Sequence, residues 1–416
     1  MLDTEKSFKL PKWKKRKPLD KRLLARRILT AVITLILLAA LCFAGVLELL
    51  TLTEYRPLQE ETISVDNMGD LRTPTAGEPL TVVTWNTGYA ALGDNADFFM
   101  DGGESVQTAD HERVISNLQG IANEIAALTP DVVFLQEVDR DSTRSHRINE
   151  EIWLGNALLE QRGTGYSTAF AYNHKVAFIP YPVPPIGRVQ AGLMTMTRFS
   201  GASAQRIQLP CPFKWPMRTA NLKRGLLVER IPVTDPADPE ARRDLVLVNL
   251  HLEAYDDGEG KAEQTARLRS FLQNEVGSGN YVIAGGDFNQ IFSDQDTVGY
   301  AVPEGSGLWE PGIIDTAEMG PLLTCLMDAS VPSCRSLDRP YAGADHTDFQ
   351  YYLIDGFIVS DNVTVESVQT KDLGFVVSDH NPVILKCSLQ SSAPEKKKKG
   401  RGKTLFLHSR VKGPML

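Results

Sequence analysis

Polar residues end or interrupt six apolar runs in this 416-residue sequence, and they carry carboxylate, amide and imidazole groups that can bind metals and move protons. They are Asn86, Gln136 with Glu137, His251, Asp287 with Asn289, Asp355, and the run Ser378–Asn381. Each of them alone has an ordinary explanation as a turn residue, a surface residue or a satisfied core histidine. A buried charge without a partner costs several kcal/mol, so packing alone explains six such interruptions poorly. We therefore expect these residues to share one site.

The elements that must position these residues are short strands interspersed with a few helices. Apolar runs predict strands at Thr81–Trp85, Asp131–Gln136, Leu193–Thr197, Gly225–Ile231, Leu245–Leu252, Tyr281–Ala284, Tyr351–Val359, Val363–Gln369 and Pro382–Leu389. Helical spacing of apolar residues predicts a helix capped by Asp110 and ending at Leu128, and two more at Ile148–Gln161 and Lys261–Val276. Many strands without strict alternation indicate an α/β fold in which two packed sheets have helices outside them.

The ordered motifs TWN, LQEV, VNLHL, GGDFN, IDGFIV and SDHNPV resemble those of the endonuclease/exonuclease/phosphatase superfamily, over residues 78–390. The segment GLMTMTRF (192–199) is also similar to a family strand, although Thr197 replaces the serine of that pattern. The resemblance implies a four-layered α/β sandwich, with two mixed sheets flanked by helices and the site at one end of the sheets. It also implies a metal-dependent hydrolase of phosphoester bonds.

Carried over residue by residue, the resemblance implies a divalent metal held by Glu137 and Asp379, with Asn86 beside them. Carboxylate and amide oxygens suit Mg²⁺ or Mn²⁺ better than zinc. The sequence has no Cys-x-x-Cys pair for a thiolate zinc site.

The resemblance also assigns catalytic roles. Asp287 would orient or deprotonate the attacking water, and Asn289 would hold a phosphate oxygen. His380, paired with Asp355, would stabilise charge on the phosphate, and His251 is a candidate acid for the leaving oxygen. In-line attack on a phosphoester needs these three kinds of help, but the sequence does not decide which histidine is the acid.

An uncharged stretch of twenty residues, Ile28–Leu47, follows a strongly basic segment. As a helix it would be about 30 Å long, the thickness of the hydrocarbon core of a membrane. The positive-inside rule places the basic end in the cytoplasm and the later residues outside. A cleaved signal peptide fits less well, because the segments are long and no small-x-small cleavage site follows.

These observations predict five parts. They are a basic cytoplasmic segment (1–27), a transmembrane signal anchor (28–47), a linker (48–78), a catalytic domain (79–390) and a basic disordered tail (391–416). Between residues 27 and 391 the chain has 25 Lys and Arg residues against 48 Asp and Glu residues, a formal charge near −23. Such an acidic body argues against tight binding of nucleic acid, which favours basic surfaces.

Three functions are compatible with the motifs. The first is a hydrolase of lipid head groups, sugar phosphates or nucleotides outside the membrane. The second is an extracytoplasmic nuclease, which His251 favours and the net charge disfavours. The third is a non-catalytic binding module, which the complete set of motif residues disfavours. No obligate protein partner is predicted.

Some smaller features stay open at this stage. His174, Arg188, Arg198, Arg218 and Arg224 are further candidates to contact substrate. The proline-rich segment 181–187 is either a loop at the rim of the site or a plain connection. Cys325 and Cys334 are close enough in sequence to form a disulfide in an oxidising exterior.

Overall fold

The computed structural model describes residues 20–392, apart from residues 68, 70, 257, 258 and 298. The chain divides into two compact units, Met1–Glu54 and Tyr55–Leu416. Of the predicted basic segment and the predicted tail, residues 1–19 and 393–416 lie outside the described residues.

The first unit contains one long helix, α1 (Lys21–Leu52), which includes the whole predicted membrane span. Asp20 caps its N-terminus, because the Asp20 carboxylate accepts a hydrogen bond of 2.9 Å from the backbone N–H of Arg22. The helix has a mean hydropathy of 2.6 over its most apolar window and is long and apolar enough to cross a membrane. This is the one such helix among the described residues.

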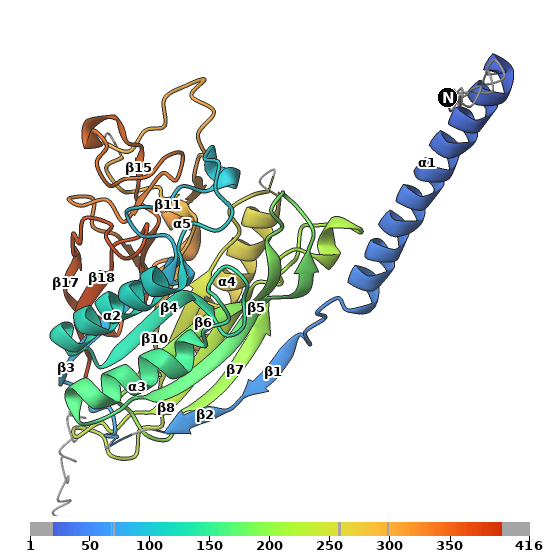
Figure 1. Ribbon diagram of the computed structural model, residues 1–416. Coiled ribbons are helices and arrows are strands. Elements are labelled where there is room, and N and C mark those ends of the chain that lie inside the picture. The colour runs from blue at the N-terminus through green and yellow to red at the C-terminus, as the bar shows by residue number, and fades with distance from the viewer. Residues whose placement is uncertain (1–19, 68, 70, 257–258, 298, 393–416) are drawn as a thin grey trace, which may run out of the picture. The chain divides into compact units, whose positions relative to one another are not determined.

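The second unit is built on two seven-stranded sheets (Figure 1). The first sheet has the strand order β1 (Glu60–Ile63), β7 (Ser203–Gln208), β8 (Gly225–Pro232), β9 (Asp244–His251), β10 (Tyr281–Asp287), β16 (Asp355–Ser360), β13 (Leu323–Leu326). The second has the order β17 (Val363–Thr370), β18 (Val383–Leu389), β3 (Pro79–Asn86), β4 (Val132–Asp139), β6 (Gly187–Thr197), β5 (Ser167–Ile179), β2 (Val65–Asn67). Both are mixed, because β9 runs parallel to β10 and β3 to β4, while the other neighbours are antiparallel.

The remaining elements are short or lie outside the sheets. The helices are α2 (His111–Leu128), α3 (Glu150–Arg162), α4 (Glu259–Gly277) and α5 (Thr316–Met319). Two small ladders pair β11 (Gln290–Phe292) with β12 (Gly312–Ile314), and β14 (Cys334–Arg335) with β15 (Tyr351–Tyr352). Single 3-10 turns are η1 (Gly88–Ala90), η2 (Phe99–Asp101), η3 (Met217–Thr219) and η4 (His346–Asp348).

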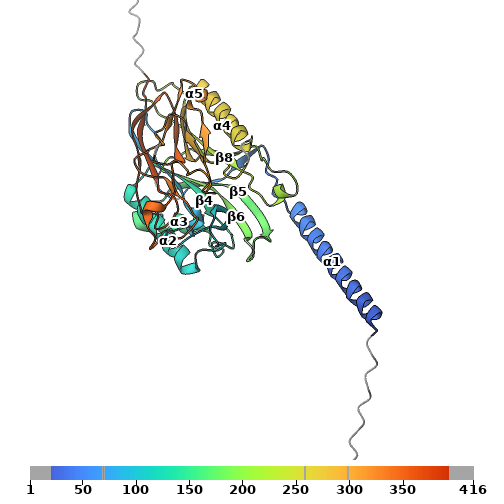
Figure 2. The same cartoon turned by 90° about the horizontal axis from the view of Figure 1, so that it is seen from above.

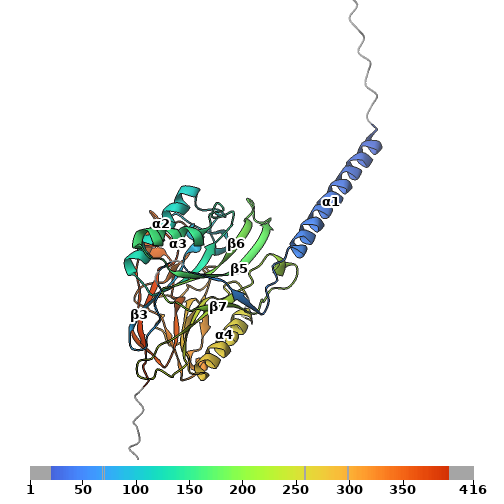
Figure 3. The ribbon, with the colours of Figure 1, turned by 90° about the horizontal axis from the view of Figure 1, so that it is seen from below.

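Three layers of apolar contact join four layers of structure. Apolar residues of α2 and α3, such as Leu118 and Leu154, pack against the second sheet. Residues of α4, such as Leu268, pack against the first sheet. Between the sheets, Phe134 and Phe357 belong to a third cluster. Figures 2 and 3 show α2 and α3 on one side of the strands and α4 on the other. The predicted α/β sandwich of two mixed sheets flanked by helices is confirmed.

Two glycines of the GGDFN motif allow the sheets to pack closely beneath the site. A Cβ atom on Gly285 would lie 2.6 Å from the ring of Phe357 and 3.0 Å from that of Phe134. A Cβ atom on Gly286, whose φ is +156°, would lie 1.9 Å from the carbonyl oxygen of Leu250. Neither position accepts a side chain without moving the backbone or a buried ring.

Most predicted elements are present, with three corrections. The predicted strand Tyr351–Val359 is divided into β15 and β16, which belong to different sheets. The predicted linker is not free of regular structure, because α1 continues to Leu52 and residues 60–67 form β1 and β2. These two short strands add to the edges of different sheets, where the main-chain hydrogen bonds of β5 and β7 would otherwise be unpaired. The possible disulfide is not formed, since Cys325 and Cys334 are both free.

Candidate active site

The eight site residues predicted from the sequence come together at one edge of the sandwich. Asn86 and Glu137 lie at the carboxyl ends of the parallel strands β3 and β4. His251 and Asp287 end the parallel strands β9 and β10 and stand opposite each other in the ladder. Asp355 begins β16 directly opposite Asp287. Asn289 follows β10, and Asp379 with His380 precedes β18.

A bulge at the end of β4 turns Glu137 toward this edge. The pairing of β4 with β6 shifts between Leu135 and Val138, and Glu137 has a φ of +57°. A non-glycine residue with positive φ costs free energy and is found where a side chain must be directed to a special position. The bulge therefore places the Glu137 carboxylate beside the other site residues.

A buried hydrogen-bond network holds the two sheets together below the site. Gln136 Nε2 donates to Asn249 Oδ1 over 2.8 Å. Asn249 Nδ2 donates in turn to the backbone carbonyls of Leu135 (3.1 Å) and Met194 (2.9 Å). Because Asn249 belongs to the first sheet and the others to the second, these bonds fix the position of Glu137 relative to His251. The sequence analysis missed Asn249, although it interrupts an apolar run two residues before His251.

Asn86 connects the carboxylates of both sheets. Its Nδ2 donates to Asp287 Oδ2 over 3.0 Å and to Glu137 Oε1 over 3.3 Å. Its Oδ1 accepts from the backbone N–H of Gly88 over 3.0 Å. A Cβ atom on Gly88 would lie 2.8 Å from Asp379 Oδ1, which explains why a glycine follows the TWN motif. In this orientation Asn86 positions the two carboxylates, and its oxygen is occupied by the backbone.

His380 is held by one carboxylate and faces two others. Its Nδ1 lies 2.8 Å from Asp355 Oδ2, and its Nε2 lies 3.9 Å from Asp287 Oδ2 and 4.0 Å from Asp379 Oδ2. Burial alone would lower the pKa of His380, but the charge of Asp355 and the other nearby groups raises it well above its usual value. These neighbours favour the charged form of the His380 imidazole.

His251, by contrast, favours the neutral form of its imidazole. Its Nε2 lies 3.4 Å from Asp287 Oδ2, and its Nδ1 lies 4.0 Å from Glu137 Oε1. Burial lowers the pKa of His251 well below its usual value, and the charges of Arg224 and His380 add to this effect. One neutral and one charged imidazole thus face the same carboxylate, which gives the two histidines different proton chemistry.

The carboxylates suit a cation. The pKa of Asp379 is raised to about 6. Burial is the main cause of this shift, the charge of His380 opposes it, and the charge of Glu137 adds to it. Among the described residues, two groups of possible ligand atoms lie within 4.8 Å of one another: Cys334 with Asp379 and His380, and Asp287 with Asp355 and His380. A divalent cation beside Glu137 and Asp379 would offset the repulsion that contributes to the raised pKa of Asp379. The predominance of oxygen atoms fits Mg²⁺ or Mn²⁺.

Asn289 is fixed with its backbone in the left-handed region, at a φ of +51°. Its backbone N–H donates to Asp287 Oδ1 over 2.9 Å, and its Nδ2 donates to the carbonyl of Leu252 over 2.9 Å. These bonds tie the loop after β10 to the chain after β9. Asn289 therefore holds Asp287 in place as well as lying beside it.

A family model described as "Endonuclease/Exonuclease/phosphatase family" matches residues 83–380, which is more than half of the chain. The chain belongs to the endonuclease/exonuclease/phosphatase family. Members of this family are nucleases, phosphodiesterases and phosphatases. A search of curated proteins found no match.

Several solved structures are similar to this family member. An endonuclease/exonuclease/phosphatase from Beutenbergia cavernae is 21% identical with a TM-score of 0.48, over 75% of this chain and 72% of that one. A protein of the same description from Bacteroides vulgatus is 14% identical with a TM-score of 0.45, over 75% and 100%. The human Nocturnin catalytic domain with bound sulfate is 16% identical with a TM-score of 0.41, over 79% and 98%. The family assignment rests on the sequence match, since these TM-scores are below 0.5.

Two further polar pairs near the site of this family member were not predicted. Arg144 lies over the ring of buried Tyr89, 3.5 Å from its centroid, and pairs with Asp139 over 3.1 Å. Tyr255 donates to Asp101 Oδ1 over 2.8 Å, and burial raises the pKa of Asp101 to about 6. Asp101 ends the 3-10 turn η2 and Tyr255 lies in the loop after β9, and neither belongs to a regular apolar pattern, so the sequence carried no signal for them.

The other candidate contact residues are engaged within the protein. Arg224 donates to Glu253 over 3.2 Å and to the carbonyl of His251 over 3.2 Å, so it supports the end of β9. Arg188 pairs with Asp141 over 2.8 Å. Arg198 lies near Asp131, at the opposite end of β4 from Glu137, so the structure does not bring it to the site. His174 lies 3.0 Å from the carbonyl of Ala220, and burial lowers its pKa to about 3.

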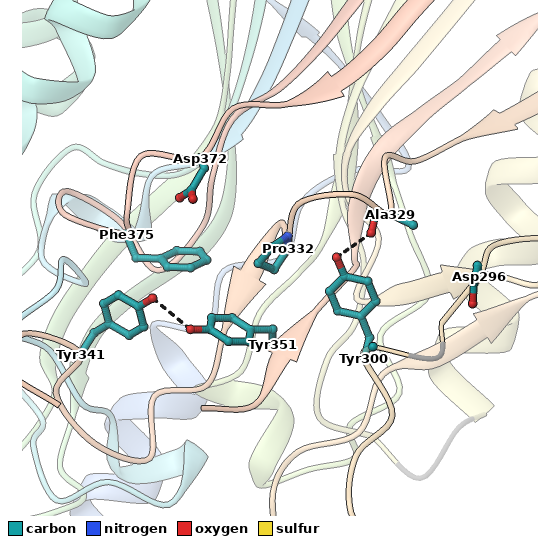
Figure 4. A pocket seen from close by; sticks show the side chains of 9 residues that line it. Asp296, Tyr300, Ala329, Pro332, Tyr341, Tyr351, Asp372 and Phe375 are labelled. Carbon is teal, nitrogen blue, oxygen red and sulfur yellow. Dashed lines mark hydrogen bonds between the residues drawn. The ribbon is translucent and has the colours of Figure 1, made fainter. Parts of the chain in front are cut away.

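A cavity of about 460 Å³ lies apart from these residues (Figure 4). Aromatic rings dominate its lining, and Tyr341 and Tyr351 share a hydrogen bond of 3.0 Å between their hydroxyls. Tyr300 donates to the carbonyl of Ala329 over 2.9 Å on the other side of the cavity. None of the eight predicted site residues lines it.

The Asp287→Asn variant is expected to be more stable than wild type when metal is removed. Burial and the charge of Asp355 raise the pKa of Asp287 from 3.8 to about 7. Between these values the folded protein keeps a proton that the unfolded chain has lost, so the contribution of Asp287 to stability falls as pH rises from 3.8 to 7. Asparagine does not ionise. In EDTA, the free energy of unfolding of Asp287→Asn minus that of wild type should grow by about 2 kcal/mol or more from pH 4 to pH 7.

Denaturant unfolding of both full-length proteins in mild detergent measures this difference. A difference that stays constant from pH 4 to pH 7 would show that Asp287 does not titrate with a raised pKa.

Proposed function

We propose that this protein is a divalent-metal-dependent hydrolase of phosphoester bonds that acts outside the membrane spanned by α1. The observation that supports it most is the geometry of His380, whose Nδ1 lies 2.8 Å from Asp355 Oδ2 and whose Nε2 faces Asp287. A charged imidazole fixed opposite a buried carboxylate can stabilise a phosphate beside a group that accepts a proton.

In this proposal each residue has a definite role. Asp287, which Asn86 and Asn289 hold by hydrogen bonds of 3.0 and 2.9 Å, orients the attacking water and takes its proton. His380 binds the phosphate oxygens through Nε2. A divalent cation at Glu137 and Asp379, with Asn86 beside them, would supply neutralisation of the phosphate charge.

The reaction balances as a simple hydrolysis. The water oxygen forms a new bond to phosphorus, the bond to the leaving oxygen breaks, and the leaving oxygen receives a proton. Neutral His251 lies 3.4 Å from Asp287 Oδ2, so a proton taken from water by Asp287 can pass to it. His251 would then act as the acid toward the leaving oxygen.

A substrate panel tests the function with the full-length protein in mild detergent. It contains bis-p-nitrophenyl phosphate, phospholipids, plasmid DNA and RNA, each with Mg²⁺ or Mn²⁺ and with EDTA. We expect metal-dependent hydrolysis of the small diester and of lipid, with DNA cut slowly because the body is acidic. Rapid metal-dependent cutting of DNA would favour the alternative, a nuclease, which His251 supports. Hydrolysis that EDTA leaves unchanged would contradict the metal requirement.

The orientation of the protein is tested separately. Protease added to intact cells should digest the second unit if it lies outside the membrane. Digestion only after the cells are broken would place the active site in the cytoplasm.

A further inference from the structure

The end of β5 and the turn that joins it to β6 form an apolar run of ten consecutive residues. Residues 177–186 read AFIPYPVPPI and contain no charge. Phe178, Tyr181 and Val183 are 42%, 70% and 94% exposed. Figure 3 shows the green hairpin of β5 and β6 extending beyond the neighbouring strands. A contiguous exposed apolar segment is unusual on the surface of a soluble protein and indicates a binding surface.

A second exposed loop lies against the base of this hairpin. Residues 214–218 read KWPMR and are all exposed, including Trp215 and Met217. The loop continues to Ala220, whose carbonyl lies 3.0 Å from His174 Nε2 on β5. Lys223 then donates to the carbonyl of Asn173 over 2.6 Å. The two loops therefore belong to one surface.

A third segment joins the same surface. The ring of Phe99 in η2 meets the ring of Tyr181 edge-on, with 6.2 Å between the centroids. Met100 beside it is exposed. We call the exposed side chains of these segments the apolar rim. It consists of Met100, Phe178, Tyr181, Val183, Trp215 and Met217.

The apolar rim lies at the same edge of the sandwich as the candidate active site. Asp139, two residues after Glu137, pairs with Ala191 near the start of β6, and the hairpin turn precedes this point. Asp101 of η2 accepts a hydrogen bond from Tyr255, four residues after His251. A surface that docks on the apolar rim would therefore lie next to the catalytic groups.

The chain that comes from α1 also enters the second unit at this edge. The ring of Tyr55, the first residue of this unit, lies 6.3 Å from the ring of Tyr172 on β5. Lys175 Nζ lies 5.9 Å from the centroid of the Tyr55 ring. Four residues later, the carbonyl of Gln59 accepts from the N–H of Gln208 at the end of β7. Only two residues separate Leu52, the last residue of α1, from Tyr55, so the entry point stays close to one end of the helix.

We propose that the apolar rim inserts into the surface of the membrane that α1 spans, and that the active site hydrolyses the phosphoester head group of a lipid in that membrane. The choice of substrate rests on the proposed function, whereas the docking does not. Tryptophan and tyrosine favour the boundary between water and hydrocarbon, and the exposed Lys175 and Lys214 beside them would meet anionic head groups. A lipid surface explains this combination better than a protein partner, because α1 holds the entry point of the second unit near a membrane.

A depth measurement tests the docking without any activity. The full-length protein, with Cys42 and Cys211 replaced by alanine, is reconstituted in vesicles that contain anionic lipid. A fluorophore is attached to Val183→Cys or, as the matched control, to Asp238→Cys. Asp238 is exposed in the loop between β8 and β9, at the end of these strands that is opposite to His251. Lipids with a quencher near the head group should quench the label at 183 at least about fivefold more than the label at 238.

Equal quenching at the two positions would overturn the docking. Shielding of the label at 183 that also occurs in detergent and rises with protein concentration would overturn it as well, because it would indicate contact between two copies of the chain.

A ratio of rates tests the lipid substrate. In Phe178→Ser/Val183→Ser, the rate on vesicle lipid divided by the rate on bis-p-nitrophenyl phosphate should fall about tenfold, because two apolar side chains no longer enter the bilayer. Asp238→Ser should keep the wild-type ratio. A wild-type protein that hydrolyses the soluble diester but no vesicle lipid would overturn the lipid substrate and leave the proposed function standing. A wild-type protein inactive on every substrate would overturn the proposed function, while the quenching result would still decide the docking.

Discussion

Replacement of His380 by alanine should lower kcat on a soluble phosphodiester by about 10²- to 10⁴-fold. Burial lowers the pKa of His380, but the charge of Asp355 and of other nearby groups raises it well above the usual value, which favours the charged imidazole in the wild-type protein. The variant loses this charge at the position where the phosphate of the substrate becomes more negative. Since charge stabilisation is often the largest part of catalysis, KM should change much less than kcat.

The fold should survive this substitution. The backbone carbonyl of His380 accepts a hydrogen bond of 2.9 Å from Trp85 Nε1, and its backbone N–H donates to Ser378 Oγ over 3.1 Å. Alanine keeps both bonds. The main structural cost is the buried carboxylate of Asp355, which loses its partner at Nδ1 of the ring.

Two controls distinguish loss of catalysis from loss of structure. His111→Ala removes an exposed imidazole at the start of α2 and should retain wild-type kcat. Asp355→Asn leaves the ring of His380 in place but removes the charge that raises its pKa. Its kcat should lie between those of wild type and His380→Ala. As the pH is raised, its activity should also begin to decline at a lower pH than the activity of wild type does. Wild-type turnover in His380→Ala would show that the catalytic centre lies elsewhere.

The sequence predicted which residues meet at the candidate active site, because these residues break strong apolar patterns. His251 and Asp287 end buried strands, where packing alone explains a polar side chain poorly. Parallel neighbours such as β9 and β10 then place the ends of their strands side by side, so residues far apart in sequence meet.

The parts that the sequence missed lack such contrast. The strands β1 and β2 are short and largely polar, and they form only because β7 and β5 offer unpaired edges. The role of Asn249 depends on contacts with Gln136 across the sandwich, which no local pattern encodes. The predicted strand at 351–359 combined two elements because its apolar residues are continuous, whereas Leu353 and Ile354 connect two sheets. In each case a tertiary contact decided the local structure.

Substitution of Glu137 by glutamine should raise the Mg²⁺ concentration required for half-maximal activity by about 10- to 100-fold. Glutamine has nearly the same size as glutamate, so the bulge in β4 and the position of Asn86 should be retained. The lost charge, however, acts on Asp379. Burial raises the pKa of the Asp379 carboxyl, and the charge of Glu137 raises it as well. Removing it relieves the repulsion between the carboxylates and so weakens the reason for a cation to bind.

The effect should reach metal affinity before it reaches the chemical step, because Asp287 and His380 are unchanged in the Glu137→Gln protein. Saturating Mg²⁺ or Mn²⁺ should therefore restore much of the activity, and the titration should show a shifted midpoint rather than a lower plateau alone. Glu366→Gln is the matched control, because Glu366 is exposed on the edge strand β17 and makes the same change in net charge. An identical Mg²⁺ midpoint in Glu137→Gln and Glu366→Gln would remove Glu137 from the proposed metal site.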